Sequence, residues 1–167
     1  MRIREATLED ATAISDLIRP LAEKYIAHEF SAKGARDLLW SMEPEAIRGY
    51  FKSGYKYHVA EENGVLVGVV AVRDNMHLYH LFVPDTFRGQ GFARKLWQVA
   101  HDACRDAGNV GEYTVNSSSF AVGMYRRFGF VETGPLETRN GVRAVPMKSI
   151  EAESPSGGSA AEARRYV

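Results

Sequence analysis

The chain has 167 residues, of which 45% are hydrophobic, and this is enough for one domain with a sizeable core. Its 21 basic and 21 acidic residues cancel, which argues against a nucleic-acid binder that works by neutralising phosphates. The N-terminal sequence MRIREATLED is charged where a signal peptide is apolar, and no apolar stretch approaches the about 18 residues of a membrane span. A single cysteine, Cys104, excludes an internal disulfide. We therefore expect a soluble, cytoplasmic protein with no membrane and no nucleic-acid partner.

The first predicted elements are a short strand and a helix. Residues 2–6 are expected to form the strand, and the helix over 7–24 begins with a capping box in which Asp10 stands three residues after Thr7. Apolar residues then recur at helical spacing along one face. Pro20 lies inside this pattern, and because proline lacks the N–H that a helix interior needs, we expect it to kink or split the helix.

A second helical region and a hairpin follow. Residues 31–53 carry helical apolar spacing, and Pro44 is expected to begin a separate helix within them. The pattern then changes to that of strands over 57–61 and 65–72. Asn63-Gly64 lies between these runs, and Asn-Gly is a strong signal for a tight β-hairpin.

The remaining predicted elements complete a mixed sheet flanked by helices. We expect strands over 76–83, 113–116, 130–133 and 144–147, helices over 92–107 and 120–128, and an Asn140-Gly141 turn joining the last two strands. The resulting order, β-α-α-β-β-β-α-β-α-β-β, predicts an α/β (α+β) architecture over residues 1–150. Residues 151–167 are rich in Ser, Gly, Ala and Glu and have no apolar period, so we expect a disordered tail.

A glycine-containing loop between the strand at 76–83 and the helix at 92–107 carries the clearest chemical signal. Gly89 and Gly91 allow the backbone to take positive φ and to approach a ligand closely. The first N–H groups of the following helix have no intrahelical partner, and with the helix dipole they form an anion site that suits a pyrophosphate. Arg88 adds charge to this site, and Arg94 or Lys95 could add more.

Gly-x-Gly alone is a weak signal, because a tight strand-to-helix connection uses the same glycines. A dinucleotide-binding loop would need Gly or Ala where Arg94 stands, and a P-loop would need a Gly-Lys-Ser/Thr sequence that the chain lacks. A regulatory protein that binds a nucleotide through the loop at 88–93 stays open as an alternative.

The residues around this loop resemble the signature of the GNAT family of N-acetyltransferases. Leu81-Phe82-Val83-Pro84 followed by Arg88-Gly89-Gln90-Gly91-Phe92-Ala93 is similar to the family pattern Leu-x-Val-x-Pro, then Arg/Gln-x-x-Gly-x-Gly/Ala. The resemblance implies a mostly antiparallel sheet, acetyl-CoA as cosubstrate and no metal. It also implies loop amides that hold the pyrophosphate and a strand end that pairs with the pantetheine arm. The cofactor-binding residues expected here are Leu81, Phe82, Val83, Arg88, Gly89, Gln90, Gly91, Phe92, Ala93 and Arg94.

A second stretch resembles the same family. Ser118-x-x-Ala121-x-x-x-Tyr125-x-x-x-Gly129-Phe130 is similar to Asn-x-x-Ala-x-x-Leu-Tyr-x-x-x-Gly-Phe, with Ser118 replacing Asn and Met124 replacing Leu. The resemblance adds Asn116, Ser118 and Ala121 to the cofactor site, with Asn116 as a substitute for the missing amide. It also makes Tyr125 the catalytic acid, because a phenol beside the sulfur can donate a proton or hydrogen bond to the departing CoA thiolate. The alternative role for Tyr125 is packing in the core.

An ammonium acceptor must lose a proton before it can attack. His77, Glu112 and His80 are the candidate bases, in that order, because relatives in the family carry Glu or His at the position of His77 and some carry a glutamate near that of Glu112. Strand alternation places His77, Tyr79 and Leu81 on one face and His80 on the other, unless a bulge alters the pattern. If none of these residues acts, bulk water takes the proton.

The acceptor pocket of this family is built partly from the first two helices. We therefore expect it among Tyr25, His28, Glu29, Phe30, Trp40, Tyr50, Phe51 and Tyr55. The sequence predicts an N-acetyltransferase that moves the acetyl group of acetyl-CoA to the primary amine of a small molecule. A non-catalytic acyl-CoA-binding or sensor module on the same fold is the alternative. The oligomeric state stays open, with a homodimer among the options.

Overall fold

The computed structural model describes residues 1–151, so residues 152–167 of the expected tail lie outside the described part of the chain. The helices are α1 (Ala11–Tyr25), α2 (Ala32–Trp40), α3 (Pro44–Lys52), α4 (Phe92–Asp106) and α5 (Val122–Arg127). The strands are β1 (Arg2–Glu5), β2 (Lys56–Glu62), β3 (Val65–Arg73), β4 (His77–Phe82), β5 (Glu112–Ser117), β6 (Val131–Glu132), β7 (Glu137–Arg139) and β8 (Val142–Ile150). Two short 3-10 turns, η3 (Asp85–Phe87) and η4 (Ser119–Ala121), lie next to the functional site.

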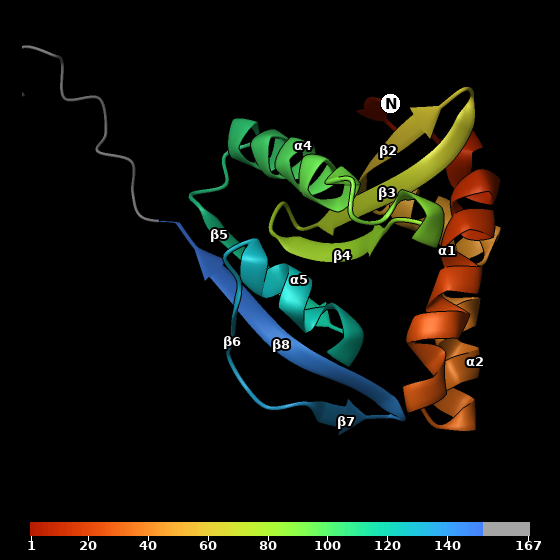
Figure 1. The fold of residues 1–167 in the computed structure, drawn as a ribbon, viewed down its shortest axis with the longest axis vertical. Helices are drawn as coiled ribbons and strands as arrows, with labels where there is room; N and C mark the ends of the chain where they lie inside the picture. Colours follow the sequence, from red (N-terminus) through yellow and green to blue (C-terminus); the bar gives the residue numbers. More distant parts are fainter. Residues whose placement is uncertain (152–167) are drawn as a thin grey trace, which may run out of the picture.

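The eight strands form one sheet. Seven follow the order β1-β2-β3-β4-β5-β8-β6, and β7 pairs with β8 (Figure 1). Every neighbouring pair is antiparallel except β4 and β5, which run parallel. The expected mixed, mostly antiparallel sheet with flanking helices is confirmed.

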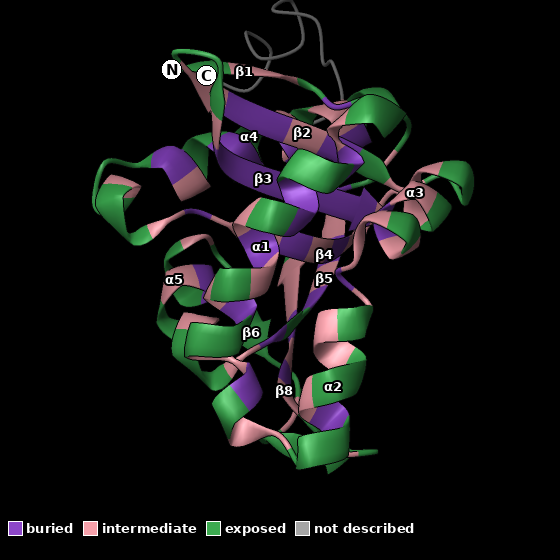
Figure 2. Cartoon of the chain, turned by 90° about the vertical axis from the view of Figure 1, so that its right-hand side faces the viewer, coloured by how far each residue is buried: buried purple, intermediate pink, exposed green. Residues whose placement is uncertain are grey.

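Helices cover both faces of the sheet and divide the core into two clusters. On one face, α4 and α5 pack on the strands through Leu96, Trp97 and Tyr125. On the other face, α1 and α3 bury Ile14, Ile18 and Ile47. Figure 2 shows the central strands β2 and β3 in purple, with α1 in front of them and α4 behind. A strand buried on both faces explains why β3 reads as the nearly unbroken apolar run VLVGVVAV rather than as an alternating one.

Several local signals in the sequence form the structures they predict. Asn63 and Gly64 have φ values of 52° and 77°, which is the left-handed pair that a two-residue hairpin turn between β2 and β3 requires. Pro44 occupies the first turn of α3, where its missing N–H costs nothing. The Asp10 carboxylate accepts the Thr7 N–H at 2.7 Å, as the expected capping box requires.

Two expectations are corrected in detail. Of the two outcomes expected at Pro20, a kink or a split, the split does not occur, because α1 is continuous over 15 residues and its buried face holds it against the sheet on either side of the proline. The Asn140-Gly141 turn joins β8 to β7, an additional strand, and not to β6. The sequence of β7 is Glu-Thr-Arg, all exposed, so no apolar alternation reveals it.

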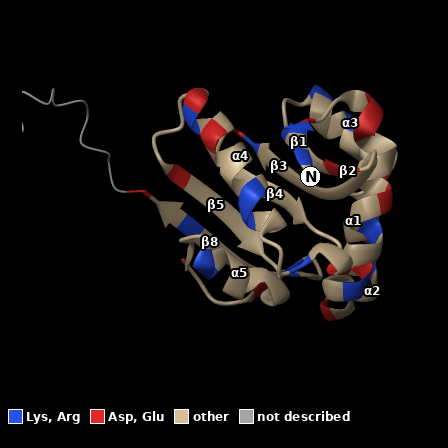
Figure 3. Ribbon diagram, turned by 45° about the horizontal axis from the view of Figure 1, so that its top comes forward, with Lys and Arg blue, Asp and Glu red and all other residues tan. Residues whose placement is uncertain are grey.

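Charged residues lie on the surface and the strands around the cleft are mainly uncharged. Figure 3 shows both signs mixed on α1, α2 and α3, and blue at the end of α4 that faces the gap between β4 and β5. Within residues 1–151, no helix combines the length and the apolar character that crossing a bilayer requires.

Candidate active site

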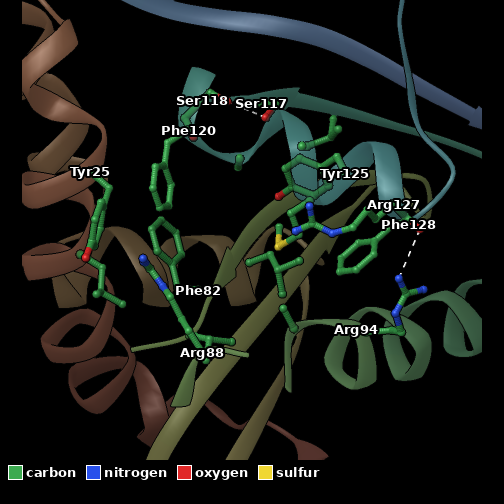
Figure 4. Close-up of a pocket in the computed structure, with 18 of the residues that line it drawn as sticks. Tyr25, Phe82, Arg88, Arg94, Ser117, Ser118, Phe120, Tyr125, Arg127 and Phe128 are labelled. Carbon is green, nitrogen blue, oxygen red and sulfur yellow. Dashed lines mark hydrogen bonds between the residues drawn. The ribbon is translucent and has the colours of Figure 1, made fainter. Parts of the chain in front are cut away.

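A cleft opens where β4 and β5 part. The two parallel strands pair only at His77 with Thr114 and at Leu78 with Val115, although both strands run further. Beyond these pairs their backbone edges are no longer bonded to each other, and the separation forms a cleft of about 560 Å³. Its walls come from α4 and α5 on one side and from α1 on the other (Figure 4).

The N-terminus of α4 borders this cleft. Gly91 caps the helix with φ 78°, and Gly89 has φ 74°. A Cβ at either position would meet no atom within 4 Å, so the backbone conformation rather than crowding calls for glycine. The first backbone hydrogen bond of the helix runs from the Lys95 N–H to the Gly91 carbonyl at 3.0 Å. The N–H groups before Lys95 therefore remain available to an anion in the cleft.

The side chains that line the cleft carry positive charge. Within residues 1–151 the lining includes Arg88, Arg94 and Arg127 and no carboxylate. Arg94 donates to the backbone carbonyl of Arg127 at 3.3 Å, which holds α4 and α5 together at the mouth of the cleft. Arg88 pairs with Asp85 at 3.2 Å. The charge and the free amides together favour an anionic ligand such as a pyrophosphate.

Tyr125 projects from α5 with 5% of its surface exposed. Its ring packs edge-on against Phe130, with 5.6 Å between the ring centroids. Figure 4 shows the hydroxyl directed into the cleft, and no group within residues 1–151 forms a hydrogen bond with it. Burial raises the pKa of this phenol far above its ordinary value, so the group keeps its proton at physiological pH.

A β-bulge decides which side chains of β4 reach the cleft. In the register with β3, Tyr79 is an extra residue between His80 and Leu78. As a result Leu78 and Leu81 both pack in the cluster on the α4 side, and Tyr79 lines the cleft. Simple alternation, which would put His77, Tyr79 and Leu81 on one face, therefore does not hold, because a bulge, the exception allowed for in that expectation, interrupts it at Tyr79.

His77 does not line the cleft. It lies where β4 and β5 still pair, with its Nδ1 atom 2.7 Å from the Thr114 hydroxyl. Burial, with a smaller effect of Arg73, lowers the pKa of His77 to about 4. The ring is therefore neutral at pH 7 but a weak base, and neither its place nor its pKa fits the general base expected at this position.

The other two candidate bases are also away from the cleft. Glu112 begins β5 and pairs with Lys148 at 2.5 Å. His80 is buried with its Nδ1 atom 3.2 Å from the Tyr57 hydroxyl, and burial lowers the pKa of His80 to about 3. No carboxylate or imidazole lines the cleft within the described chain.

Most of the expected cofactor residues come together. The cleft is lined by Leu81, Phe82, Val83, Arg88, Gly89, Gly91, Phe92, Ala93, Arg94, Asn116, Ser118 and Ala121. Gln90 is the exception, and its amide donates to the Thr86 carbonyl at 3.2 Å instead. Of the expected acceptor residues, Tyr25 lines the cleft, and Tyr50 and Tyr55 pack against Tyr79 with ring centroids 5.2 Å from it.

Several lining residues are not among those predicted from the sequence, and three of them are large or charged. Tyr79 reaches the cleft because of the bulge, which no local pattern in β4 marks. Phe120 and Arg127 occupy unconstrained positions inside the second family-like stretch, and no sequence signal distinguishes them.

Comparison with known proteins gives consistent matches. The sequence profile of the acetyltransferase (GNAT) domain matches residues 26–151. An acetyltransferase of Agrobacterium fabrum is 36% identical over 78 residues, which is 46% of this chain and 57% of that protein. The chain spans about half the length of the curated relatives it matches.

Solved structures share the fold at low sequence identity. A GCN5-related N-acetyltransferase from Rhodopseudomonas palustris has a TM-score of 0.76 at 19% identity, covering 90% of this chain and 95% of that one. PaiA N-acetyltransferase from Thermoplasma acidophilum, solved in complex with coenzyme A, has a TM-score of 0.71 at 16% identity, covering 90% of this chain and 98% of that one.

Proposed function

The chain belongs to the GNAT family of acetyltransferases, and on that premise we propose that it transfers the acetyl group of acetyl-CoA directly to a primary amine of a small molecule. The observation that carries the proposal is the protonated Tyr125 hydroxyl, which faces the cleft without a protein partner. Its neighbours across the cleft are the unpaired edge of β4 and the free amides of α4.

The pyrophosphate, the pantetheine arm and the thioester of acetyl-CoA each have a matching group in the proposed complex. The pyrophosphate lies against the amides at the start of α4, where Gly89 and Gly91 keep the backbone open and Arg88 and Arg94 add charge. The pantetheine arm enters between the parted strands and bonds to the free edge of β4 at 81–83, as an added strand would. This course brings the thioester to Tyr125.

The reaction forms a C–N bond and breaks the C–S bond of the thioester. The amine nitrogen attacks the thioester carbonyl, and negative charge moves to the CoA sulfur as the C–S bond breaks. Tyr125 donates its hydrogen bond, or its proton, to this developing thiolate. Because burial raises the pKa of Tyr125, the phenol is still protonated at the pH where the amine begins to lose its own proton.

We propose that water takes the proton of the amine. The lining offers no carboxylate or imidazole within the described chain, and His77 and Glu112 lie outside it. A primary alkylamine has a pKa near ~10, so only a small neutral fraction is present at pH 7 and this fraction reacts. The supply of neutral amine then limits kcat/KM at low pH.

The test is CoA release from acetyl-CoA in the presence of a broad set of primary amines, measured for the wild type and for Tyr125→Phe. Tyr113→Phe is the matched control, because it removes the hydroxyl of another buried tyrosine that does not line the cleft. A wild-type protein that binds acetyl-CoA and acetylates no amine would instead support a non-catalytic acyl-CoA-binding module.

A further inference from the structure

Past Tyr125, on the α1 side of the sheet, the cleft is lined by apolar and aromatic side chains and by one charged group, Arg88. We name this part the aromatic half. Figure 4 shows Tyr25, Phe82, Phe120 and Arg88 on the side away from Arg94, Arg127 and Phe128. The Arg88 guanidinium lies 4.2 Å from the centroid of the Tyr25 ring and 5.0 Å from that of Phe120. The apolar and aromatic members are Leu21 and Tyr25 of α1, Ile26 directly after α1, Tyr79 and Phe82 of β4, and Phe120 of η4.

A pair of stacked rings forms one wall of the aromatic half. Tyr25 and Phe120 lie parallel, with 4.6 Å between their centroids and 22° between their planes. Next to this pair, the Ser119 hydroxyl donates to the Glu29 carboxylate, which links η4 to the segment that follows α1. Phe120 nevertheless keeps 56% of its surface exposed. Phe120 lines the cleft together with the other apolar side chains of the aromatic half, and a contiguous apolar surface in a cleft is typical of a groove that binds an apolar ligand.

The polar ends of the two tyrosines are already engaged. The Tyr25 hydroxyl donates to Asp85 at 2.6 Å, and the Tyr79 hydroxyl donates to the Tyr50 hydroxyl at 3.1 Å. Burial, followed by the Tyr50 hydrogen bond, raises the pKa of Tyr79 and keeps it neutral. The two tyrosines therefore offer no spare hydroxyl proton, and they line the aromatic half with their rings, of which that of Tyr25 is partly covered by Phe120 and the Arg88 guanidinium.

The Asp85 carboxylate near the aromatic half is balanced without a ligand, because it binds Lys24 at 2.7 Å and Arg88 at 3.2 Å. The lining itself contains no carboxylate within residues 1–151, and the Glu29 carboxylate, which accepts from Ser119, lies outside it. A second ammonium group on an acceptor would therefore find no counter-ion in the lining and would be repelled by Arg88.

We infer that the acceptor is a monoamine whose single amino group is carried on an aromatic body, that is, an arylalkylamine. The body packs against Tyr25, Tyr79 and Phe120, and the amino group points past Tyr79 to the thioester beside Tyr125. This inference rests on the proposed function and narrows its substrate class. Polyamines and aminoglycosides, which carry several ammonium groups and little apolar surface, do not match this lining.

The experiment is a comparison of kcat/KM at saturating acetyl-CoA for phenethylamine, tryptamine, spermidine and kanamycin. We expect both arylalkylamines to exceed the other two amines by at least about tenfold. In Phe120→Ala, kcat/KM for phenethylamine should fall about tenfold through KM, with the KM for acetyl-CoA unchanged within about twofold. Trp40→Ala is the matched control, since it removes another exposed aromatic, 75% exposed, that does not line the cleft.

The outcomes separate this inference from the proposed function. Preference for spermidine or kanamycin, or an unchanged KM in Phe120→Ala, would overturn the substrate class while acetyl transfer to amines stands. If CoA is released from acetyl-CoA with none of the amines, the proposed function fails. The inference on the acceptor is then tested separately, by calorimetry of phenethylamine with the CoA-loaded protein. Binding that weakens about tenfold in Phe120→Ala and not in Trp40→Ala supports an arylalkylamine site; absence of binding contradicts it.

Discussion

Replacing Gly91 by glutamate tests the anion site at the start of α4. Gly91 has φ 78° and a Cβ there would enter open space, so the variant side chain would stand in the cleft beside the free amides. A carboxylate roughly 6 Å from a pyrophosphate charge, at an effective dielectric constant of about 20–40, costs about 1.4–2.8 kcal/mol. Gly91→Glu should therefore weaken acetyl-CoA binding about ten- to a hundredfold, measured by calorimetry.

The hairpin between β2 and β3 supplies a close control. Gly64 has φ 77°, and a Cβ there also meets no atom within 4 Å, but it does not line the cleft. Both Gly→Glu variants carry the same cost of a non-glycine residue in the left-handed region, roughly 1–2 kcal/mol of stability. Only the Gly91 variant should lose affinity. A folded Gly91→Glu protein with wild-type affinity, or equal losses in both variants, would refute the anion site.

Three further predictions concern the acid, the proton and the fold. Tyr125→Phe should lower kcat by roughly a hundredfold and leave the Kd of acetyl-CoA unchanged, while the control Tyr113→Phe keeps the wild-type kcat. Stopped-flow measurement of CoA release tests this, and a wild-type kcat in Tyr125→Phe would mean that Tyr125 only packs in the core. Since the pKa of His77 is lowered to about 4 and the pKa of Tyr125 is raised, neither titrates between pH 6 and 9. In that range kcat/KM should rise about tenfold per pH unit, because the neutral fraction of the amine rises by the same factor, and His77→Gln should change kcat/KM less than about threefold. A pH profile that levels off with a pKa near ~7 in the wild type and not in His77→Gln would restore His77 as the base. Gly34→Ala should destabilise the protein by about 1–3 kcal/mol in urea unfolding, because its Cβ would overlap the Gly141 carbonyl where α2 meets β8; an unchanged midpoint would contradict this contact.

The sequence predicts well which side chains line the α4 end of the cleft, because that end is built from contiguous segments. The loop at 88–93 encodes its own backbone conformation through Gly89 and Gly91, and the helix it begins follows directly. Tyr125 is also found, because Gly129 ends its helix at a fixed distance. In both places the geometry depends on residues within one turn of each other.

The rest depends on contacts between distant segments. The bulge at Tyr79 is a property of the register between β3 and β4. The periodicity within β4 alone therefore could not show that Tyr79 lines the cleft and His77 does not. The aromatic half joins Tyr25 to Phe120, which are 95 residues apart, and only the folded sheet brings them together. β7 is missed for a different reason, since three exposed polar residues carry no strand pattern.

Direct acetyl transfer to an amine is the central claim, and product analysis tests it most directly. The purified protein would be incubated with acetyl-CoA labelled in its acetyl group and with phenethylamine and a broad set of other primary amines. We expect a labelled N-acetyl product in one-to-one ratio with released CoA, formed about a hundredfold more slowly by Tyr125→Phe. CoA release without an acetylated amine, or equal rates in the wild type and Tyr125→Phe, would contradict it.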